Sequence, residues 1–280
     1  MKIVLSRKGL DSAAGGIPGP LVDGRPLSVP IPANGTPSGC RYGDLASPIP
    51  GIVERLGKGM SRRRLCHLDP DIDASVLRAP RPRGWRGSLG QVGAAQSHLA
   101  AQGVGRGDLF VFWGLFRKVE RVSRAWRFAG RPEHRIFGWL QVDAVLAVGE
   151  EWQEALRRLP WLEGHPHLHA GWGASNTVYV ASDALRLDGS DSGLAGFGRL
   201  RRGRRLSTAD SRGVSTWNVP AWLDPSRGGT GMTYHPPARW LGDGTLRAAP
   251  RGQEFVAHVG TRRDALEWLE TLIGGDATGD

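Results

Sequence analysis

The chain has 280 residues, of which 40% are hydrophobic and 23% charged; this is a globular balance that excludes a disordered protein. Two cysteines without CxxC spacing exclude a disulfide framework and a zinc ribbon, and 41 glycines with 19 prolines argue against a helical bundle. The net charge of +10 favours a polyanionic partner, although an arginine-rich genome composition is an alternative explanation.

The opening residues Met1–Leu5 are too short and lack the pattern of a signal peptide, and no apolar run approaches the roughly 18 residues of a membrane span. We therefore expect a cytoplasmic protein with no membrane partner.

Apolar runs and alternation predict β-strands at five places along the chain: 2–5, 108–113, 135–142, 176–181 and 255–259. The second and third are expected to pair as a hairpin across 118–133. Helical spacing predicts helices at four places: 52–58, 88–102, 145–159 and 262–273. These elements indicate an α/β or α+β fold with a mixed central sheet, few helices and many long loops. We expect a single domain over residues 1–274 and a flexible tail over 275–280.

The loop after the first strand is polar and rich in glycine, and it contains Ser6, Arg7, Lys8, Asp11 and Ser12. Ligands of α/β sheets gather at the carboxyl ends of strands, so this loop is a candidate site for an anion. The spacing of a P-loop is absent, and an ordinary polar turn is an equally good interpretation.

Two short histidine-containing motifs have the residue types of a metal site. In the stretch from His67 to Asp71, alternation would place His67, Asp69 and Asp71 on one side of an extended chain. In the stretch from His165 to His169, the three histidines share a side for the same reason. Imidazoles and carboxylates from distant segments could form a mononuclear or dinuclear metal site. A solvated acidic turn and a loop with exposed histidines are the alternatives.

Several tryptophans and arginines lie in polar contexts that suit nucleic acid. Trp113, Trp139 and Trp268 are expected in the core, whereas Trp85, Trp172, Trp217 and Trp222 are in loop-like stretches where they could stack on a base. An arginine-rich stretch at 199–212 could contact a phosphate backbone.

A series of motifs follows one another along nearly the whole chain: the 1–16 opening, Asp23-Gly24-Arg25, Pro30-Ile31-Pro32, Arg41-Tyr42-Gly43-Asp44, 67–71, Gly114 to Arg117, 136–142, His165-Pro166-His167 and 176–181. In this order they resemble the third family of nucleotide-modification-associated domains. The resemblance implies an association with phage and bacterial gene neighbourhoods that modify bases in DNA. His169 lies outside the pattern, which favours His165 and His167 as the pair.

The resemblance and the residues together favour a metal-dependent enzyme that modifies, for example oxidises, a base in DNA or a nucleotide precursor. The expected metal ligands are Asp11, His67, Asp69, His165 and His167, with iron favoured over manganese or zinc. The expected catalytic residues are Lys8, Asp11, Ser12 and Asp71. The expected substrate or phosphate contacts are Ser6, Arg7, Arg41, Arg117, Gln141 and Asn176.

Two alternatives remain open at this point. A metal-free transferase would bind a donor phosphate at the glycine-rich loop and use an Asp/His pair as general base and orienter. A non-enzymatic reader of modified DNA would use the arginine-rich stretch and a loop tryptophan. The expected partners are DNA or a nucleotide, together with other DNA-modification enzymes.

Overall fold

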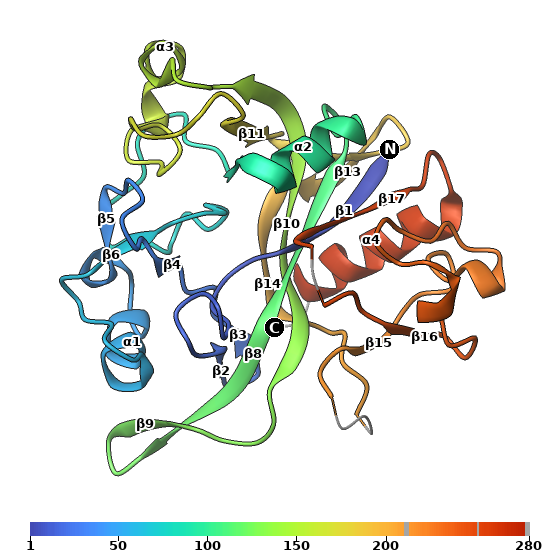
Figure 1. Ribbon diagram of the computed structural model, residues 1–280, viewed down its shortest axis with the longest axis horizontal. Coiled ribbons are helices and arrows are strands. Elements are labelled where there is room, and N and C mark those ends of the chain that lie inside the picture. The colour runs from blue at the N-terminus through green and yellow to red at the C-terminus, as the bar shows by residue number, and fades with distance from the viewer. Residues whose placement is uncertain (210–212, 251, 278–280) are drawn as a thin grey trace.

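A computed structural model describes residues 1–209, 213–250 and 252–277 (Figure 1). Its centre is a mixed sheet, which confirms the fold class expected from the sequence. The main path of this sheet runs in the order β17 (Glu254–His258), β1 (Lys2–Arg7), β8 (Leu109–Val122), β10 (Glu133–Ala147), β11 (Thr177–Ala181) and β7 (Ser88–Gln91). β1 is parallel to β8, and the other neighbours on the path are antiparallel. The expected hairpin between the second and third predicted strands is therefore confirmed.

Shorter strands extend this sheet and form small sheets beside it. The strands that attach to the path are β2 (Gly19–Val22), β3 (Arg25–Pro26), β9 (Ala125–Phe128) and β14 (Phe197–Arg205). A three-stranded sheet contains β4 (Ile31–Pro32), β6 (Leu65–His67) and β5 (Cys40–Arg41). Two pairs complete the strands: β12 (Ala184–Leu187) with β13 (Ser190–Ala195), and β15 (Thr216–Asn218) with β16 (Thr245–Arg247).

The described part of the chain has four α-helices: α1 (Ile49–Leu56), α2 (Gly93–Ala101), α3 (Trp152–Arg158) and α4 (Arg263–Ala277). Four single 3-10 turns lie at Tyr42–Asp44, Pro160–Leu162, Pro225–Arg227 and Pro237–Arg239. Among the residues that the structure describes, no helix has both the length and the apolar character of a membrane span.

Strand alternation divides the core between the two faces of the central sheet. On one face, Trp113 packs with Trp217 and Phe255 beneath α4. On the other face, Phe110 packs against Phe112 and Tyr179. Adjacent β8 residues thus point to opposite faces, as a period of two requires. A third cluster of apolar side chains lies under α1 and the three-stranded sheet, and it includes Tyr42, Ile49 and Cys66.

Three sequence-based predictions need correction. The helix expected over 88–102 begins only at Gly93, because residues 88–91 are recruited into the sheet as β7. The helix expected over 145–159 is reduced to α3, because β10 continues through Ala147 to pair with β11. Trp217 and Trp222 are not available for stacking on a base, since both are buried in the core against aromatic neighbours.

The expected tail also begins later than predicted from the sequence, because α4 includes residues 275–277. Residues 278–280, like Arg212 of the arginine-rich stretch, lie outside the described residues.

Candidate metal centre

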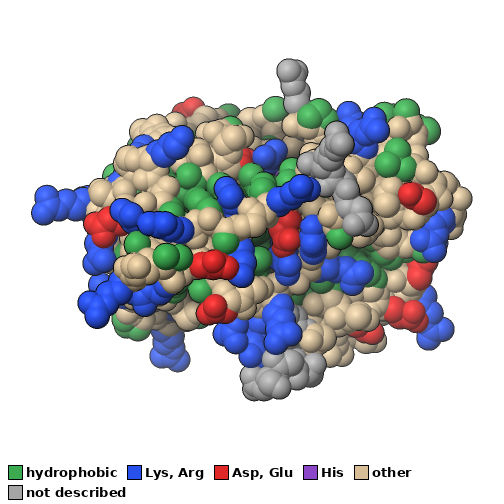
Figure 2. All heavy atoms as spheres, turned by 90° about the horizontal axis from the view of Figure 1, so that it is seen from below, with side chains coloured by type: hydrophobic (Ala, Val, Ile, Leu, Met, Phe, Trp, Pro, Cys, Tyr) green, Lys and Arg blue, Asp and Glu red, His purple; other side chains and the backbone are tan. Residues whose placement is uncertain are grey.

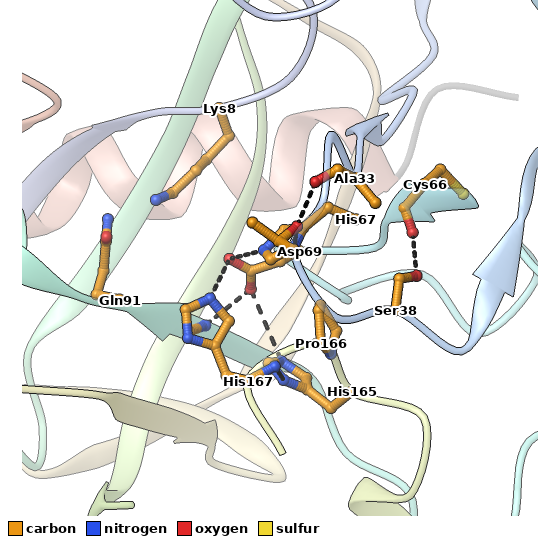
Figure 3. Close-up of polar contacts among 12 residues, drawn as sticks. Lys8, Ala33, Ser38, Cys66, His67, Asp69, Gln91, His165, Pro166 and His167 are labelled. Atoms are coloured by element: carbon orange, nitrogen blue, oxygen red, sulfur yellow. Dashed lines mark hydrogen bonds and ion pairs between the residues drawn. The ribbon is translucent and has the colours of Figure 1, made fainter. Parts of the chain in front are cut away.

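Three side chains from two distant segments meet beside the central sheet (Figure 3). His67 ends β6, and Asp69 follows two residues later. His167 lies in the loop that precedes β11. One potential ligand atom from each of the three residues lies within 4.8 Å of the others. The two histidine-containing motifs therefore meet in the fold through these three residues.

The local fold explains how His67 reaches this position. β6 is held between β4 and β5, with His67 opposite Ile31 and Cys66 opposite Cys40. Alternation sends the Cys66 thiol into the apolar cluster under α1 and turns the imidazole of the next residue to the opposite side. The two thiols lie 3.7 Å apart in that cluster, away from the three ligand atoms.

Asp69 has one oxygen committed to the protein and one facing the histidines. Oδ1 accepts a hydrogen bond of 2.7 Å from the backbone N–H of Gly90 on β7. Oδ2 lies 3.9 Å from Nε2 of His67 and 3.9 Å from Nε2 of His167. These separations are too long for hydrogen bonds, yet short enough for the atoms to share an ion at bond lengths of about 2.0–2.2 Å.

Hydrogen bonds to the other ring nitrogens fix the orientation of both imidazoles. The hydroxyl of Thr36 donates to the carbonyl of Ala33 at 2.6 Å, so its oxygen is left as an acceptor for His67 Nδ1 at 3.5 Å. The amide of Asn176 donates to the carbonyl of His167, which turns its oxygen toward His167 Nδ1 at 2.8 Å. We therefore assign the proton to Nδ1 of each ring, which leaves a lone pair on each Nε2 facing Asp69.

His165 has the opposite arrangement. The backbone N–H of His167 donates to His165 Nδ1 at 3.2 Å, so in the neutral ring the proton must be on Nε2. That nitrogen is buried, has no hydrogen-bond partner among the described residues, and lies 3.7 Å from Oδ1 of Asp69. His165 thus presents an N–H to the carboxylate and lies outside the group of three.

Burial keeps the three histidines in their neutral form. Desolvation lowers the pKa of His67 to about 4 and that of His165 to about 3, and it also lowers the pKa of His167, although Asp69 opposes the effect in each case. Burial by itself would raise the pKa of Asp69, but the nearby imidazoles, first that of His167, hold it below its usual value. A carboxylate beside neutral imidazoles is the protonation state that binds a metal ion.

Close packing holds His167 in place. Trp172 lies parallel to its ring, with 4.5 Å between the ring centroids. On β7, a Cβ atom at Gly90 would lie 2.1 Å from Cδ2 of His167. Only glycine at position 90 therefore leaves space for the imidazole in this position, and the same residue supplies the N–H that binds Asp69.

A cavity of about 810 Å³ opens onto the three residues. Lys8 and Gln91 line it opposite the histidines (Figure 3), and Arg7, Asp11 and Ser12 line it as well. The loop after the first strand therefore lies where the sequence placed it, at the carboxyl end of β1 and beside the candidate metal centre.

A buried carboxylate orients the polar side chains on the Lys8 side of the cavity. Oε1 of Glu254 lies 3.2 Å from Lys8 Nζ and accepts hydrogen bonds from the hydroxyl of Ser6 and the amide of Gln91. Glu254 is 1% exposed, and its Oε2 has no hydrogen-bond partner among the described residues. Ser6 was expected to contact substrate, but it is fully buried and its hydroxyl donates a hydrogen bond to Glu254 instead.

The structure places Asp11 in a different role from that of a metal ligand. Its Oδ1 accepts the backbone N–H groups of Ala13 and Ala14, and its Oδ2 lies 2.7 Å from the guanidinium of Arg7. Asp11 thus closes the loop and orients Arg7 at the cavity. It is not among the three residues whose ligand atoms converge.

Asp71 lies on the far side of the cluster because β6 ends at His67, so alternation does not continue to residue 71. Its carboxylate is bound by the guanidinium of Arg81 and by the indole N–H of Trp85. Burial raises its pKa although Arg81 lowers it. Asp71 lines a separate cavity of about 490 Å³, which His165 also borders.

Four expected substrate contacts make structural interactions instead. Arg41 donates to the carbonyl of Arg63, and Arg117 donates to that of Gly130. Gln141 is buried and bonded to the backbone of Arg186. Asn176 orients His167, as described above. None of the four lines the cavity at the candidate metal centre.

Sequence reasoning missed the residues that support the site. Glu254 is an isolated acidic residue at the start of a strand, and Thr36 lies in a turn, so neither belongs to a recognisable pattern. Gly90 and Gln91 were assigned to a helix. The signal available for Glu254 was an acidic residue directly before the apolar run 255–257, at a position where the sheet buries it.

Comparison with known proteins identifies the family of the chain. The chain matches no curated protein and no solved structure significantly. The family model described as nucleotide modification associated domain 3 matches residues 2–258, which is nearly the whole chain and includes every residue of the candidate metal centre. This description indicates a role in nucleotide or DNA modification. The chain therefore belongs to the nucleotide modification associated domain 3 family.

Proposed function

We propose that this protein is a metal-dependent enzyme that modifies a base in DNA or in a nucleotide precursor, with the ion held by His67, Asp69 and His167. One observation carries the proposal. Two imidazoles whose Nδ1 atoms are already hydrogen-bonded turn the lone pairs of Nε2 toward the free oxygen of a buried carboxylate. Metal sites use second-sphere partners of this kind to orient their ligands.

The chemistry of the donor set favours iron over manganese or zinc. Two histidines and one carboxylate are the ligands of non-heme iron oxygenases, and three protein ligands leave coordination positions free for other molecules. When bound, such an ion supplies oxidative chemistry, or Lewis-acid chemistry if it is redox-inert.

The cavity provides the groups needed to hold an anionic substrate. The ammonium of Lys8 and the guanidinium of Arg7 are both oriented by carboxylates, those of Glu254 and Asp11. Cations oriented in this way form strong hydrogen bonds with phosphate oxygens. Lys8 and Arg7 would bind a phosphate group, and the amide of Gln91 would donate to or accept from the base.

A product analysis tests this proposal. The protein is loaded anaerobically with Fe²⁺ and then exposed to air, a reductant and a 2-oxoacid, with duplex DNA in one reaction and deoxynucleoside triphosphates in another. Mass spectrometry of the digested nucleosides should show a new mass that is absent with Asp69→Asn and present with the exposed control Asp183→Asn. A product that also forms in excess chelator would overturn metal dependence and support a metal-free transferase.

A further inference from the structure

The positive charge of the chain is concentrated in three segments. Residues 49–64, 117–131 and 197–205 contain sixteen lysines and arginines against two glutamates, a net charge of +14. The whole chain has a net charge of +10, so the other residues together carry −4. An arginine-rich genome would enrich the chain throughout, and it does not explain this separation of charge.

The three segments are contiguous in the fold. α1 packs against β9, where Phe128 joins the apolar cluster that contains Ile49. The end of β14 lies beside β3, which pairs with β2 and through it with the part of β8 that leads into β9. In Figure 1, α1, β9, β2 and β3 lie in the lower half of the molecule, and β14 runs beside β10 near its middle. Figure 2 views that side and shows Lys and Arg side chains gathered over its left and middle parts. We call this surface the basic face.

Much of this charge is not neutralised within the protein. Glu54 pairs with Arg62, and Glu120 pairs with Lys118. On β14, Arg199 and Arg205 pair with carboxylates from other segments. Three exposed arginines lie in the β8–β9 turn (Arg124), on β9 (Arg127) and after β9 (Arg131). In the part of the chain that the structure describes, no carboxylate lies within ion-pair distance of them.

The β8–β9 part of the basic face is too far from the candidate metal centre to contact the same mononucleotide, whereas Arg64 of this face lies close to the cavity and donates a hydrogen bond to Asn34 in its lining. Arg7, at the cavity, lies opposite Trp113 of β8, and the cationic part of that strand begins at Arg117 and ends at Val122. At about 3.3 Å per residue, the strand carries the charge about 13–30 Å away from the cavity. One helical turn of duplex DNA, about 34 Å long, spans this distance.

We propose that the basic face binds the phosphate backbone of double-stranded DNA, so that the substrate of the metal centre is a base within the polymer. This inference rests on the proposed function for the role of the cavity, and it adds the class of substrate. Backbone contacts position the duplex without reading its sequence. The basic face therefore provides affinity, and the cavity provides selection of the base.

The test is fluorescence anisotropy with a labelled 20-base-pair duplex over a range of salt concentrations. The triple variant Arg124→Gln, Arg127→Gln, Arg131→Gln removes three exposed charges from the basic face. For this variant, the slope of log K, where K is the association constant for the duplex, against log salt concentration should be smaller in magnitude by about 3. The affinity at 0.1 M salt should be lower by about tenfold or more. The matched control neutralises three exposed arginines elsewhere (Arg83, Arg158 and Arg263) and should bind like the wild type.

An equal loss of duplex affinity in the two triple variants, or no loss in either, would overturn the proposal. Tighter binding to vesicles containing phosphatidylserine than to the duplex would also overturn it. His67→Ala separates this inference from the proposed function, because it should lose metal and still bind the duplex. Metal binding without any duplex binding would show that the substrate is a monomer. Duplex binding by a protein that takes up no metal would contradict the proposed function alone.

Discussion

The substitution Gly90→Ala tests the packing that holds His167. A methyl group at this position would lie 2.1 Å from Cδ2 of the imidazole, whereas carbon atoms prefer separations of about 3.5–4.0 Å. The ring must therefore move by about 1.4–1.9 Å, unless β7 moves instead. Metal–ligand bonds tolerate about 0.2 Å, so we expect the variant to lose tight metal binding.

The same substitution should have a moderate effect on stability. Overpacking of this kind costs about 1–3 kcal/mol, and in a chain of this size each kcal/mol lowers Tm by about 2–4 °C. The assay combines thermal unfolding with competition for metal against a fluorescent chelator. Gly173→Ala is the matched control, because its Cβ would meet nothing within 4 Å. A folded Gly90→Ala protein with wild-type metal affinity would show that the contact with Gly90 does not position His167 for metal binding.

Three further substitutions or treatments have defined outcomes. Asn176→Ala removes the acceptor that orients His167 and should weaken metal binding about 10–100-fold in the chelator competition, and an unchanged affinity would argue against that role. Asp69→Asn keeps an oxygen for the N–H of Gly90 but removes the charge, so the protein should fold, as circular dichroism would show, and contain no metal by elemental analysis. The hydrogen bond with the Cys40 thiol and, after it, burial raise the pKa of Cys66. At pH 8 iodoacetamide should therefore label Cys66 only after unfolding, as peptide mass spectrometry would show, and rapid labelling of the native protein would contradict its burial.

The sequence predicted the central strands because continuous apolar runs such as Leu109–Trp113 can only be buried. It did not predict β7, whose four residues Ser-Leu-Gly-Gln have no strand pattern. Their extended conformation comes from pairing with β11, and that tertiary contact overrides local propensity. For the same reason the sequence did not predict that Gly90 and Gln91, which lie on this strand, contact the candidate site.

The sequence also predicted which residue types form the site better than it predicted which individual residues belong to it. The two short motifs His67-x-Asp69 and His165-x-His167 do contribute donors to one site, but they do so from the end of β6 and from turns after β6 and before β11, and not from extended segments. The sequence could not distinguish the two histidines of the second motif, because their roles depend on which ring nitrogen accepts the N–H of His167. It also could not show that the carboxylate of Asp11 is already occupied by Arg7 and two backbone groups.

The metal centre is tested most simply by the metal content of the purified, untagged protein, measured by elemental mass spectrometry after anaerobic reconstitution. We expect one transition-metal ion per chain in the wild type and in folded His165→Ala, and none in folded His67→Ala or His167→Ala. A wild type without metal, or a His67→Ala variant that keeps its ion, would contradict the assignment of this cluster as a metal centre.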